Sequence, residues 1–207
     1  MKRDTSAFTL VEMLAVIAIM AILFVLVAPA AKSIAGGTQL SQATDAITGS
    51  LIQARQTALA KGRLVEVRFY KTGASDVPGE QNANRFRSFQ IFEIDDAGKP
   101  VPVGKVQKLP PSIIIDSGST VTSIADAALA KTWSASDPQI SLPSVGTNYT
   151  AQAFRFRRDG STSLDPLKLW FLTLHDLNKG DGLATPPPNY ATLQIEPING
   201  EIRTFRP

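Results

Sequence analysis

One histidine and the aspartate after it, His175 and Asp176, are residues that could carry chemistry, because an imidazole beside a carboxylate can act as a general acid or base. The chain has no cysteine and no other histidine, which excludes thiol nucleophiles, thiolate metal sites and most histidine-based metal or triad chemistry. No G-x-S-x-G sequence marks a nucleophilic serine. We interpret His175 as a structural residue at a strand end and predict that the chain is not an enzyme and needs no cofactor.

The segment that follows, residues 176–182, carries oxygen atoms that could bind a cation. Asp176, Asn178 and Asp181 lie close to two glycines, a combination found in calcium-binding loops. The glutamate that completes an EF-hand loop is missing from its position, and Lys179 adds a positive charge. We favour a solvated turn over a calcium site and predict no bound metal.

Arginines gather in two parts of the chain, Arg155, Arg157 and Arg158 near one predicted strand and Arg203 and Arg206 near the end. Alternate residues of a strand share a face, so Arg155 and Arg157 should lie together. We interpret them as a solvent-facing edge that discourages strand pairing; contact with an acidic partner is the alternative. The net charge of +3, with cations and anions interspersed, argues against a nucleic-acid partner.

A long apolar segment starts close to the N-terminus. The first residues include the cations Lys2 and Arg3, the composition becomes apolar at Phe8, and residues 13–31 hold no charge. These 19 residues would form about 28 Å of helix, close to the ~30 Å hydrocarbon core of a membrane. A secretory signal peptide is the alternative, but its apolar region is usually shorter. We predict a membrane-spanning helix whose cationic N-terminal end stays in the cytoplasm.

Glu12 is the one acidic residue of this apolar segment. A carboxylate at the centre of a membrane span costs roughly 2.5–3.5 kcal/mol and normally has a partner. Near the start of a helix the cost is smaller, and the helix dipole favours an acid. The residues alone therefore allow two interpretations of Glu12, an interfacial acid at a helix start or an acid with a specific partner.

A short motif, SAFTLVE at residues 6–12, resembles the type IV prepilin signal, which is written G/F-T-L-x-E. The resemblance implies that a prepilin peptidase cleaves between Ala7 and Phe8 and that the new N-terminal Phe8 is N-methylated. Glu12 then becomes the fifth mature residue and Pro29 the twenty-second, positions that are typical of pilins. The motif departs from the family at Ala7, where glycine is usual.

The resemblance also implies an assembly role for Glu12, because the fifth-position carboxylate of pilin-like subunits is thought to meet the amine of a neighbouring subunit's first residue. Such a pair in an apolar medium would fix the register between subunits. Pro29 lacks an N–H and should kink the helix. The implied partners are a prepilin peptidase, other pilin-like subunits and the bacterial inner membrane, which the chain would cross once with its head in the periplasm.

A second helical segment is predicted over residues 38–61, after two glycines at residues 36–37 where the helix should bend or break. Its apolar residues recur at spacings of three and four, which defines one face that Ile52 and Leu59 widen. Gly62 suits a helix C-cap. We expect this helix to pack on its own sheet; a coiled coil with a partner is the alternative. The face comprises Leu40, Ala43, Ile47, Leu51, Ala54 and Ala58.

Strands are predicted after this helix. The strongest signal is Asn-Gly at residues 199–200 between two alternating runs, which is typical of a β-hairpin turn. Residues 117–149 predict at most a short helix near residues 124–131. The predicted strands cover residues 64–70, 89–94, 105–108, 112–116, 153–157, 169–174, 192–196 and 201–205.

This order, a long helix followed by strands without βαβ alternation, predicts an α+β fold with an antiparallel β-sheet or sandwich as the head. The layout is similar to that of GspH-type minor pseudopilins, including an A-R-x-x-A helix end at residues 54–58. The whole chain looks closer still to the pilin-like Verru_Chthon cassette protein D group. We expect a leader at residues 1–7, a transmembrane assembly helix at 8–35, an amphipathic helix at 36–62 and the β head at 63–207.

Two functions therefore compete. The first is a pilin-like or pseudopilin-like subunit that assembles through its N-terminal helix into a pilus or a type II secretion-like apparatus. The second is a membrane-tethered head that does not polymerise and binds an exported protein or a ligand. An envelope enzyme with a signal anchor is disfavoured because the sequence shows no catalytic constellation.

Overall fold

The computed structural model describes residues 9–73, 84–143 and 145–207, except for the side chains of residues 25–35. By its internal contacts the chain divides into two compact units, Met1–Thr38 and Gln39–Pro207. The second unit is called the head unit below. Helix α1 (Leu10–Lys61) contributes residues to both units.

A bend or a break was predicted at Gly36-Gly37, and the break is wrong because helix α1 is continuous over its 52 residues. A glycine costs only about 1 kcal/mol relative to alanine in a helix interior. The helix continues through the two glycines because extending an existing helix is much more favourable than starting a new one after a break. At its C-terminal end α1 stops before Gly62, whose φ of +60° confirms the predicted C-cap.

The predicted apolar face of α1 is confirmed in the head unit, where its six residues are at most 3% exposed and pack against the sheet. The expectation that Ile52 and Leu59 widen this face is wrong, since they are 41% and 46% exposed. Each follows a buried residue, Leu51 or Ala58, and successive residues of a helix point about 100° apart. The buried stripe is therefore narrower than the sequence suggested.

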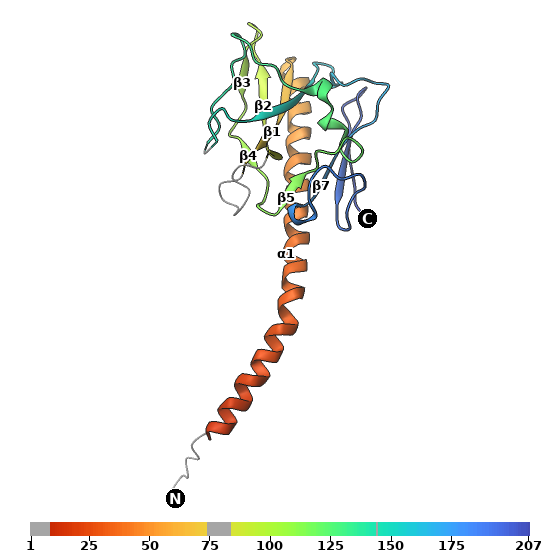
Figure 1. Ribbon diagram of the computed structural model, residues 1–207. Helices are drawn as coiled ribbons and strands as arrows, with labels where there is room; N and C mark the ends of the chain where they lie inside the picture. Colours follow the sequence, from red (N-terminus) through yellow and green to blue (C-terminus); the bar gives the residue numbers. More distant parts are fainter. Residues whose placement is uncertain (1–8, 74–83, 144) are drawn as a thin grey trace, which may run out of the picture. The chain divides into compact units, whose positions relative to one another are not determined.

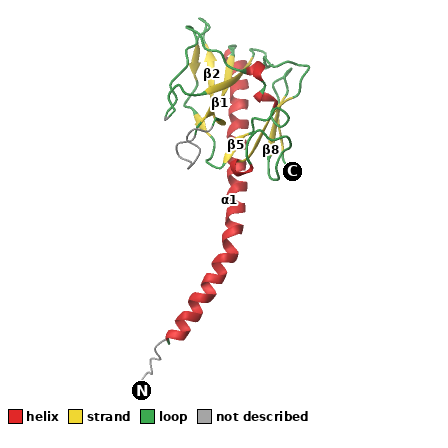
Figure 2. Cartoon of the chain, viewed as in Figure 1, coloured by secondary structure: helices red, strands yellow, loops and turns green. Residues whose placement is uncertain are grey.

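The strands of the head unit form one antiparallel sheet with the order β6-β1-β2-β5-β7-β8-β9, and β3 and β4 also pair with β2. Figures 1 and 2 show the head unit with several of these strands labelled. The α+β fold class predicted from the sequence is confirmed. The strands are β1 (Val65–Thr72), β2 (Arg85–Ile94), β3 (Pro100–Pro102), β4 (Gln107–Lys108), β5 (Ile113–Ile115), β6 (Thr150–Phe156), β7 (Trp170–Asp176), β8 (Ala191–Ile195) and β9 (Ile202–Phe205).

Every predicted strand is present. The differences between prediction and structure described next concern the segments between these strands. β3 was missed because two of its three residues are prolines, which read as loop although proline is tolerated in edge strands. The short helix expected near residues 124–131 is instead two single turns of 3₁₀-helix, Ser123–Ala125 and Ala127–Leu129. A third such turn spans Leu177–Lys179.

The two faces of β1 are buried in different ways. Val65, Val67 and Phe69 point to the core that also holds the helix face. Glu66 and Arg68 alternate with them and therefore lie on the opposite face of the strand, yet both are buried as well. Part of their cover comes from the chain between β5 and β6, which contributes Lys131 and Asp137. A smaller apolar cluster combines two residues of that chain segment, Leu142 and Tyr149, with residues of β1, β2 and β6. It consists of Tyr70, Phe92, Leu142, Tyr149 and Ala151.

The predicted hairpin between β8 and β9 is confirmed, with Ile195 opposite Ile202 in the register. Gly200 adopts a φ of +67°, which an Asn-Gly turn requires. The Arg55 Nε of α1 donates a hydrogen bond of 2.8 Å to the carbonyl oxygen of Asn199. This turn therefore ties the C-terminal hairpin to the helix.

Candidate functional sites in helix α1 and in the head unit

The start of α1 is held by a reciprocal pair of side chains, Thr9 and Glu12. The Thr9 hydroxyl accepts from the Glu12 backbone N–H at 3.3 Å, and one Glu12 carboxylate oxygen accepts from the Thr9 backbone N–H at 3.4 Å. The same oxygen lies 3.4 Å from the Thr9 hydroxyl. This arrangement is a capping box, which satisfies orphan N–H groups at a helix start and places an acid at the positive end of the dipole. Glu12 thus has a structural role as the third residue of the helix.

The side chains after the capping box form an exposed apolar surface. Every residue from Thr9 to Phe24 is exposed. Among them are the large apolar side chains of Leu10, Val11, Met13, Leu14, Val16, Ile17, Ile19, Met20, Ile22, Leu23 and Phe24, which are 41% to 77% exposed.

Several predictions for the N-terminal region fall outside the described residues. These are the cleavage site between Ala7 and Phe8, the methylation of Phe8, and the side chain of Pro29, whose backbone is helical. The predicted span at residues 13–31 also extends into the stretch whose side chains lie outside the description. Over the part of the chain that is described, no helix combines the length and apolar character needed to cross a membrane.

The partner of His175 is Asp116 and not the neighbouring carboxylate of Asp176. His175 Nε2 lies 2.8 Å from Asp116 Oδ2, and both side chains are fully buried. His175 Nδ1 lies 2.9 Å from the Asp176 carbonyl oxygen. Asp116 Oδ1 also accepts from the Gly118 backbone N–H at 2.6 Å. These bonds join the end of β7 to the chain after β5, which supports the structural interpretation of His175.

The carboxylates of Asp176 and Asp181 accept hydrogen bonds from backbone N–H groups of the turns around them. Asp176 Oδ1 accepts from the Asn178 backbone N–H at 2.7 Å, and Asp181 Oδ1 accepts from the backbone N–H groups of Ser117 and Gly182 at 2.8 Å. Among the described residues, no group of three or more acidic or histidine side chains is placed to hold a metal ion.

Five charged side chains form a cluster on the covered face of β1, called the charge cluster below. Its centre is Glu66, 3% exposed, which accepts from Arg68 Nε at 2.6 Å, Arg155 Nε at 2.7 Å and Lys131 Nζ at 2.9 Å. Both carboxylate oxygens of Asp137 accept from Arg68 Nη2, at 2.9 and 3.0 Å, and Asp137 Oδ2 lies 2.5 Å from Lys131 Nζ. Residues 131 and 137 come from the segment that covers the sheet, so the cluster fastens that segment to β1 and β6.

Aromatic rings hold the buried guanidinium of the charge cluster in place. The Arg68 side chain is fully buried, and its Cζ lies 3.9 Å from the centre of the Phe92 ring and 5.4 Å from that of Trp133. A cation over an aromatic face is attracted by the ring quadrupole, more strongly when it is removed from water. The guanidinium therefore has a fixed plane.

The cations of the charge cluster keep Glu66 ionised. Burial by itself raises the pKa of this carboxyl, but the hydrogen bond from Lys131, the charge of Arg68 and the bonds from Arg155 and Arg68 together outweigh it, and the pKa is lowered. Burial raises the pKa of the Tyr70 hydroxyl on the same face, and that group stays neutral.

Two cavities lie beside the charge cluster. The larger, about 280 Å³, is open to solvent and is lined by Glu66, Lys131, Arg155 and Ser163 together with neighbouring residues. The smaller, about 80 Å³, is lined by Arg68 and Asp137 and is mostly apolar otherwise. Arg68 Nη1 is buried and has no hydrogen-bond partner among the described residues.

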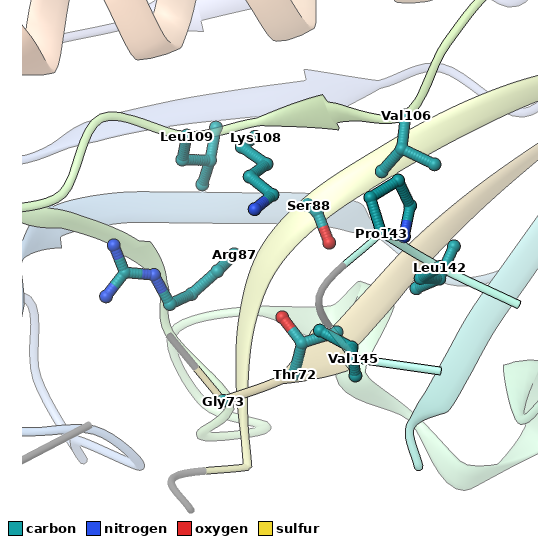
Figure 3. Close-up of a pocket in the computed structure, with 10 residues that line it drawn as sticks. All are labelled: Thr72, Gly73, Arg87, Ser88, Val106, Lys108, Leu109, Leu142, Pro143 and Val145. Carbon is teal, nitrogen blue, oxygen red and sulfur yellow. The ribbon is translucent and has the colours of Figure 1, made fainter. Parts of the chain in front are cut away.

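A third cavity lies where β1, β2 and β4 approach Leu142, Pro143 and Val145. Figure 3 shows ten residues that line it, among them Arg87 and Lys108. At about 30 Å³ it has room for little more than water. Arg87 Nη2 donates to the Pro111 carbonyl oxygen at 2.7 Å, which gives this arginine a structural role. We therefore take the charge cluster as the main candidate site of the head unit.

The arginines singled out in the sequence do not form one patch. Arg155 lies on β6 at one edge of the sheet, as predicted, but its side chain turns to Glu66. Arg203 lies on β9 at the opposite edge and pairs with Glu201, while Arg206 donates to the Ser41 hydroxyl. Sequence reasoning missed the charge cluster, because the one available signal, a glutamate and an arginine two residues apart on a strand, normally marks a solvated face.

Comparisons with known proteins give two likenesses. Residues 2–28 match the family model described as the prokaryotic N-terminal methylation motif. No curated protein matches the sequence at a significant level. Among solved structures, the chain is similar to the minor pseudopilin EpsH from the type 2 secretion system of Vibrio cholerae, with 10% identity, a TM-score of 0.45, and coverage of 82% of this chain and 98% of that chain. A structural likeness at this identity and score does not bear on activity.

Proposed function

We propose that the chain is a non-enzymatic pilin-like subunit. In this proposal a prepilin peptidase cleaves between Ala7 and Phe8, Phe8 is N-methylated, and residues 8–35 anchor the protein in the inner membrane of a bacterium. The head unit then lies on the periplasmic side. The subunit joins other pilin-like subunits in a pilus or a type II secretion-like apparatus. The methylation-motif match to residues 2–28 supports this proposal.

The observation that carries the proposal is the exposed apolar surface of α1. Large apolar side chains at positions such as 10, 11, 13, 14, 16 and 17 point in all directions around a helix, because successive residues differ by about 100°. A helix that is apolar all round is stable only when lipid or other apolar helices surround it. Assembly of similar helices within and above a membrane would provide both surroundings.

Glu12 has two roles in this proposal. In the single chain its carboxylate completes the capping box with Thr9. In the assembly it would meet the methylated amine of Phe8 of a neighbouring subunit, an opposite charge in an apolar medium. The capping box keeps the carboxylate at the first turn of α1, where such a partner could reach it. Pro29 would adjust the path of the helix between neighbours.

The mass of the mature chain tests the proposal. The full-length protein is expressed in its native host, and its N-terminus is determined by mass spectrometry. We expect a chain that begins at N-methylated Phe8, and a chain of the same kind, produced faster, from Ala7→Gly, which restores the usual residue before the cleavage site. A wild-type chain that still begins at Met1 would contradict the proposal.

A second function, a tethered head that binds an exported protein or a ligand without polymerising, is favoured by the cavities beside the charge cluster. Glu12→Ala separates the two functions. An assembling subunit should lose crosslinking to neighbouring subunits in this variant, while a tethered binding head should keep its function as long as the helix still inserts. We also propose, on the sequence resemblance alone, that the chain is related to the Verru_Chthon cassette protein D group.

A further inference from the structure

We propose that the outer edge of β9 binds an extended segment of a different protein as an added antiparallel strand, with an apolar residue over Ile52 of α1 and an acidic residue beside Arg206. The surface formed by Ile52, Ile202, Thr204 and Arg206 is called the β9 edge below. The proposal concerns the head unit and does not depend on cleavage or assembly of the N-terminal helix.

The two edges of the sheet differ in how their backbone groups are used. At the β6 edge the chain covers itself, since the Lys131 backbone N–H donates to the Ala151 carbonyl oxygen at 2.8 Å. Further along, the Ser163 backbone N–H donates to the Arg155 carbonyl oxygen at 2.8 Å. Such cover prevents the addition of a foreign strand. β9 ends the sheet on the other side, and no described strand pairs with its outer edge.

The outer edge of β9 presents unused backbone donors and acceptors. The Glu196 backbone N–H donates to the Glu201 carbonyl oxygen at 2.9 Å, which directs that oxygen to β8. Because bonding alternates along an antiparallel strand, every second residue after Glu201 also bonds to β8. Ile202 and Thr204 lie between these positions and direct their N–H and C=O groups outward. None of these groups bonds to a described residue, so β9 offers the ladder that strand addition needs.

An apolar side chain of α1 lies beside this ladder. Thr48 Oγ1 lies 3.5 Å from Thr204 Oγ1, and Arg55 bonds to the turn that precedes β9. Ile52 comes four residues after Thr48 and three before Arg55, so it shares their side of the helix. Its exposure of 41% shows that β9 does not cover it fully. Side chains of an added strand alternate between its two faces, and those on the helix side would cover Ile52.

The charges of the β9 edge favour a different protein over a second copy of this chain. If β9 paired with its own copy through both outward residues, Ile202 would lie opposite Thr204, and Arg203 would lie opposite the same arginine of the copy. Like charges directly opposite each other destabilise a strand pair. Arg206 donates to the neutral Ser41 hydroxyl at 2.9 Å and forms no ion pair with the described residues. An acidic residue of the added strand would supply the opposite charge.

Binding of a designed peptide to the full-length protein in detergent micelles tests the proposal. The probe is acetyl-Gly-Glu-Tyr-Val-Thr-Ile-Gly-amide, in which glutamate lies opposite Arg206 and isoleucine opposite Ile202. NMR should show that the probe protects the amides of Ile202 and Thr204 from hydrogen exchange. Backbone N-methylation of its valine and isoleucine, whose N–H groups face β9, should weaken binding about tenfold. N-methylation of its tyrosine and threonine, whose N–H groups face away, should have little effect.

Matched variants place the binding at the β9 edge. Thr204→Pro removes an outward N–H and should abolish binding, while the fold persists because an edge strand tolerates proline. Thr204→Val keeps the N–H and should bind as wild type does. Ile52→Ser should weaken binding several-fold, whereas Gln53→Ser, at the exposed next position of α1, should not. Arg206→Gln should weaken binding of the probe but not of the same peptide with glutamine in place of glutamate.

Three results would overturn the proposal: no binding of the probe, equal effects of the two N-methylated peptides, or equal binding by the two variants of Thr204. Analytical ultracentrifugation of wild type and Thr204→Pro tests the alternative occupant. We expect the same association state for both. Stronger self-association of wild type would identify a second copy of the chain as the occupant and would also overturn the proposal.

Discussion

Glu66 is the residue whose charge matters most for the head unit, because one buried carboxylate balances three cations. Arg68 and Lys131 each share Glu66 with Asp137, and Arg155 reaches it from the neighbouring strand. Removing one member of a buried charge network leaves its partners buried without an opposite charge. This destabilises a protein more than replacing the whole network by apolar residues does. The stability of the covered face therefore depends on this single ionised group.

Glu66→Gln should destabilise the head unit by roughly 3 kcal/mol, because the buried cations Arg68 and Lys131 then share only Asp137, and Arg155 loses its carboxylate partner. The matched control is Glu201→Gln, which removes an exposed pair with Arg203 and should cost less than about 1 kcal/mol. Denaturation of the full chain in detergent, followed by the fluorescence of Trp133 and Trp170, measures both. Similar losses in the two variants would show that the charge cluster does not stabilise the fold.

Wild type should have a larger free energy of unfolding than Glu66→Gln, and this difference should decrease as the pH falls. The pKa of Glu66 is lowered in the folded state, so its charge contributes stability at pH values above the ordinary glutamate pKa of about 4.3. As the pH falls below that value towards the lowered pKa, the unfolded chain takes up the proton first and the advantage shrinks. A difference that stays constant between pH 7 and pH 3 would contradict this account.

Apolar and polar residues alternate along β1, and Val65, Val67 and Phe69 share the face that points to the core. What this alternation could not predict is that Glu66 and Arg68 on the other face are also buried. Their cover comes from residues 131 and 137, far along the chain in a segment with little regular structure. Local patterns carry no information about such distant contacts, which explains why the main candidate site of the head unit was missed.

At the scale of elements, the turn between β8 and β9 shows why a specific glycine is needed. An added Cβ at Gly200 would meet the Gly160 carbonyl oxygen, a Phe156 ring carbon at 3.1 Å and the Arg55 Cδ at 3.2 Å. Phe156 ends β6, Gly160 lies in the turn that follows β6, and Arg55 lies on α1. The turn therefore needs glycine both for its positive φ and for the close approach of other elements.

Gly200→Ala should destabilise the head unit clearly more than Gly98→Ala. Gly98 also has a positive φ, +79°, but nothing lies within 4 Å of an added Cβ, so only the backbone cost of about 1–2 kcal/mol applies. At Gly200 the steric cost is added to the same backbone cost. Thermal unfolding of the two variants followed by circular dichroism gives the comparison, and equal melting temperatures would show that the close approach is relaxed without cost.

Elements with local signals were predicted well, and those that depend on tertiary contacts were not. The Asn-Gly turn and the buried stripe of α1 follow from chemistry within a few residues, and both are confirmed. The break at Gly36-Gly37 was wrong because the local cost of glycine was weighed without the cooperativity of a long helix. β3 was missed because its edge position, which tolerates proline, is a property of the whole sheet.

At the scale of the whole molecule, the division into two units separates an apolar helix from a packed head. The head unit contains a continuous core that includes Ile47, Leu51 and Ala54 of α1 together with the strands. None of the described large apolar side chains from Leu10 to Phe24 belongs to a core cluster. The requirements for folding the head and for burying the N-terminal half of α1 are therefore distinct.

Residues 39–207 should fold without the N-terminal unit, whereas residues 63–207 should not. The shorter fragment lacks the helix face that fills one side of the core, so the apolar face of β1 and its neighbours would meet water. Circular dichroism and thermal unfolding of the two fragments give the result. A cooperative transition only in the longer fragment is expected; the same transition in both would show that α1 is dispensable for the head.

The position of β6 in the sheet also determines the order in which the strands can pair during folding. β1 lies between β2, which follows it directly, and β6, whose Arg155 is 89 residues away from Glu66. Bringing such distant segments together slows folding, because the entropy of closing the loop is lost before the contacts form. A chain that emerges N-terminus first can form the β1–β2 pair early, but one edge of β1 stays in water until residue 156 has appeared, and until then Glu66 lacks its partner Arg155. Premature termination anywhere before β6 would therefore leave an adhesive strand edge exposed, and such products should be early targets for degradation.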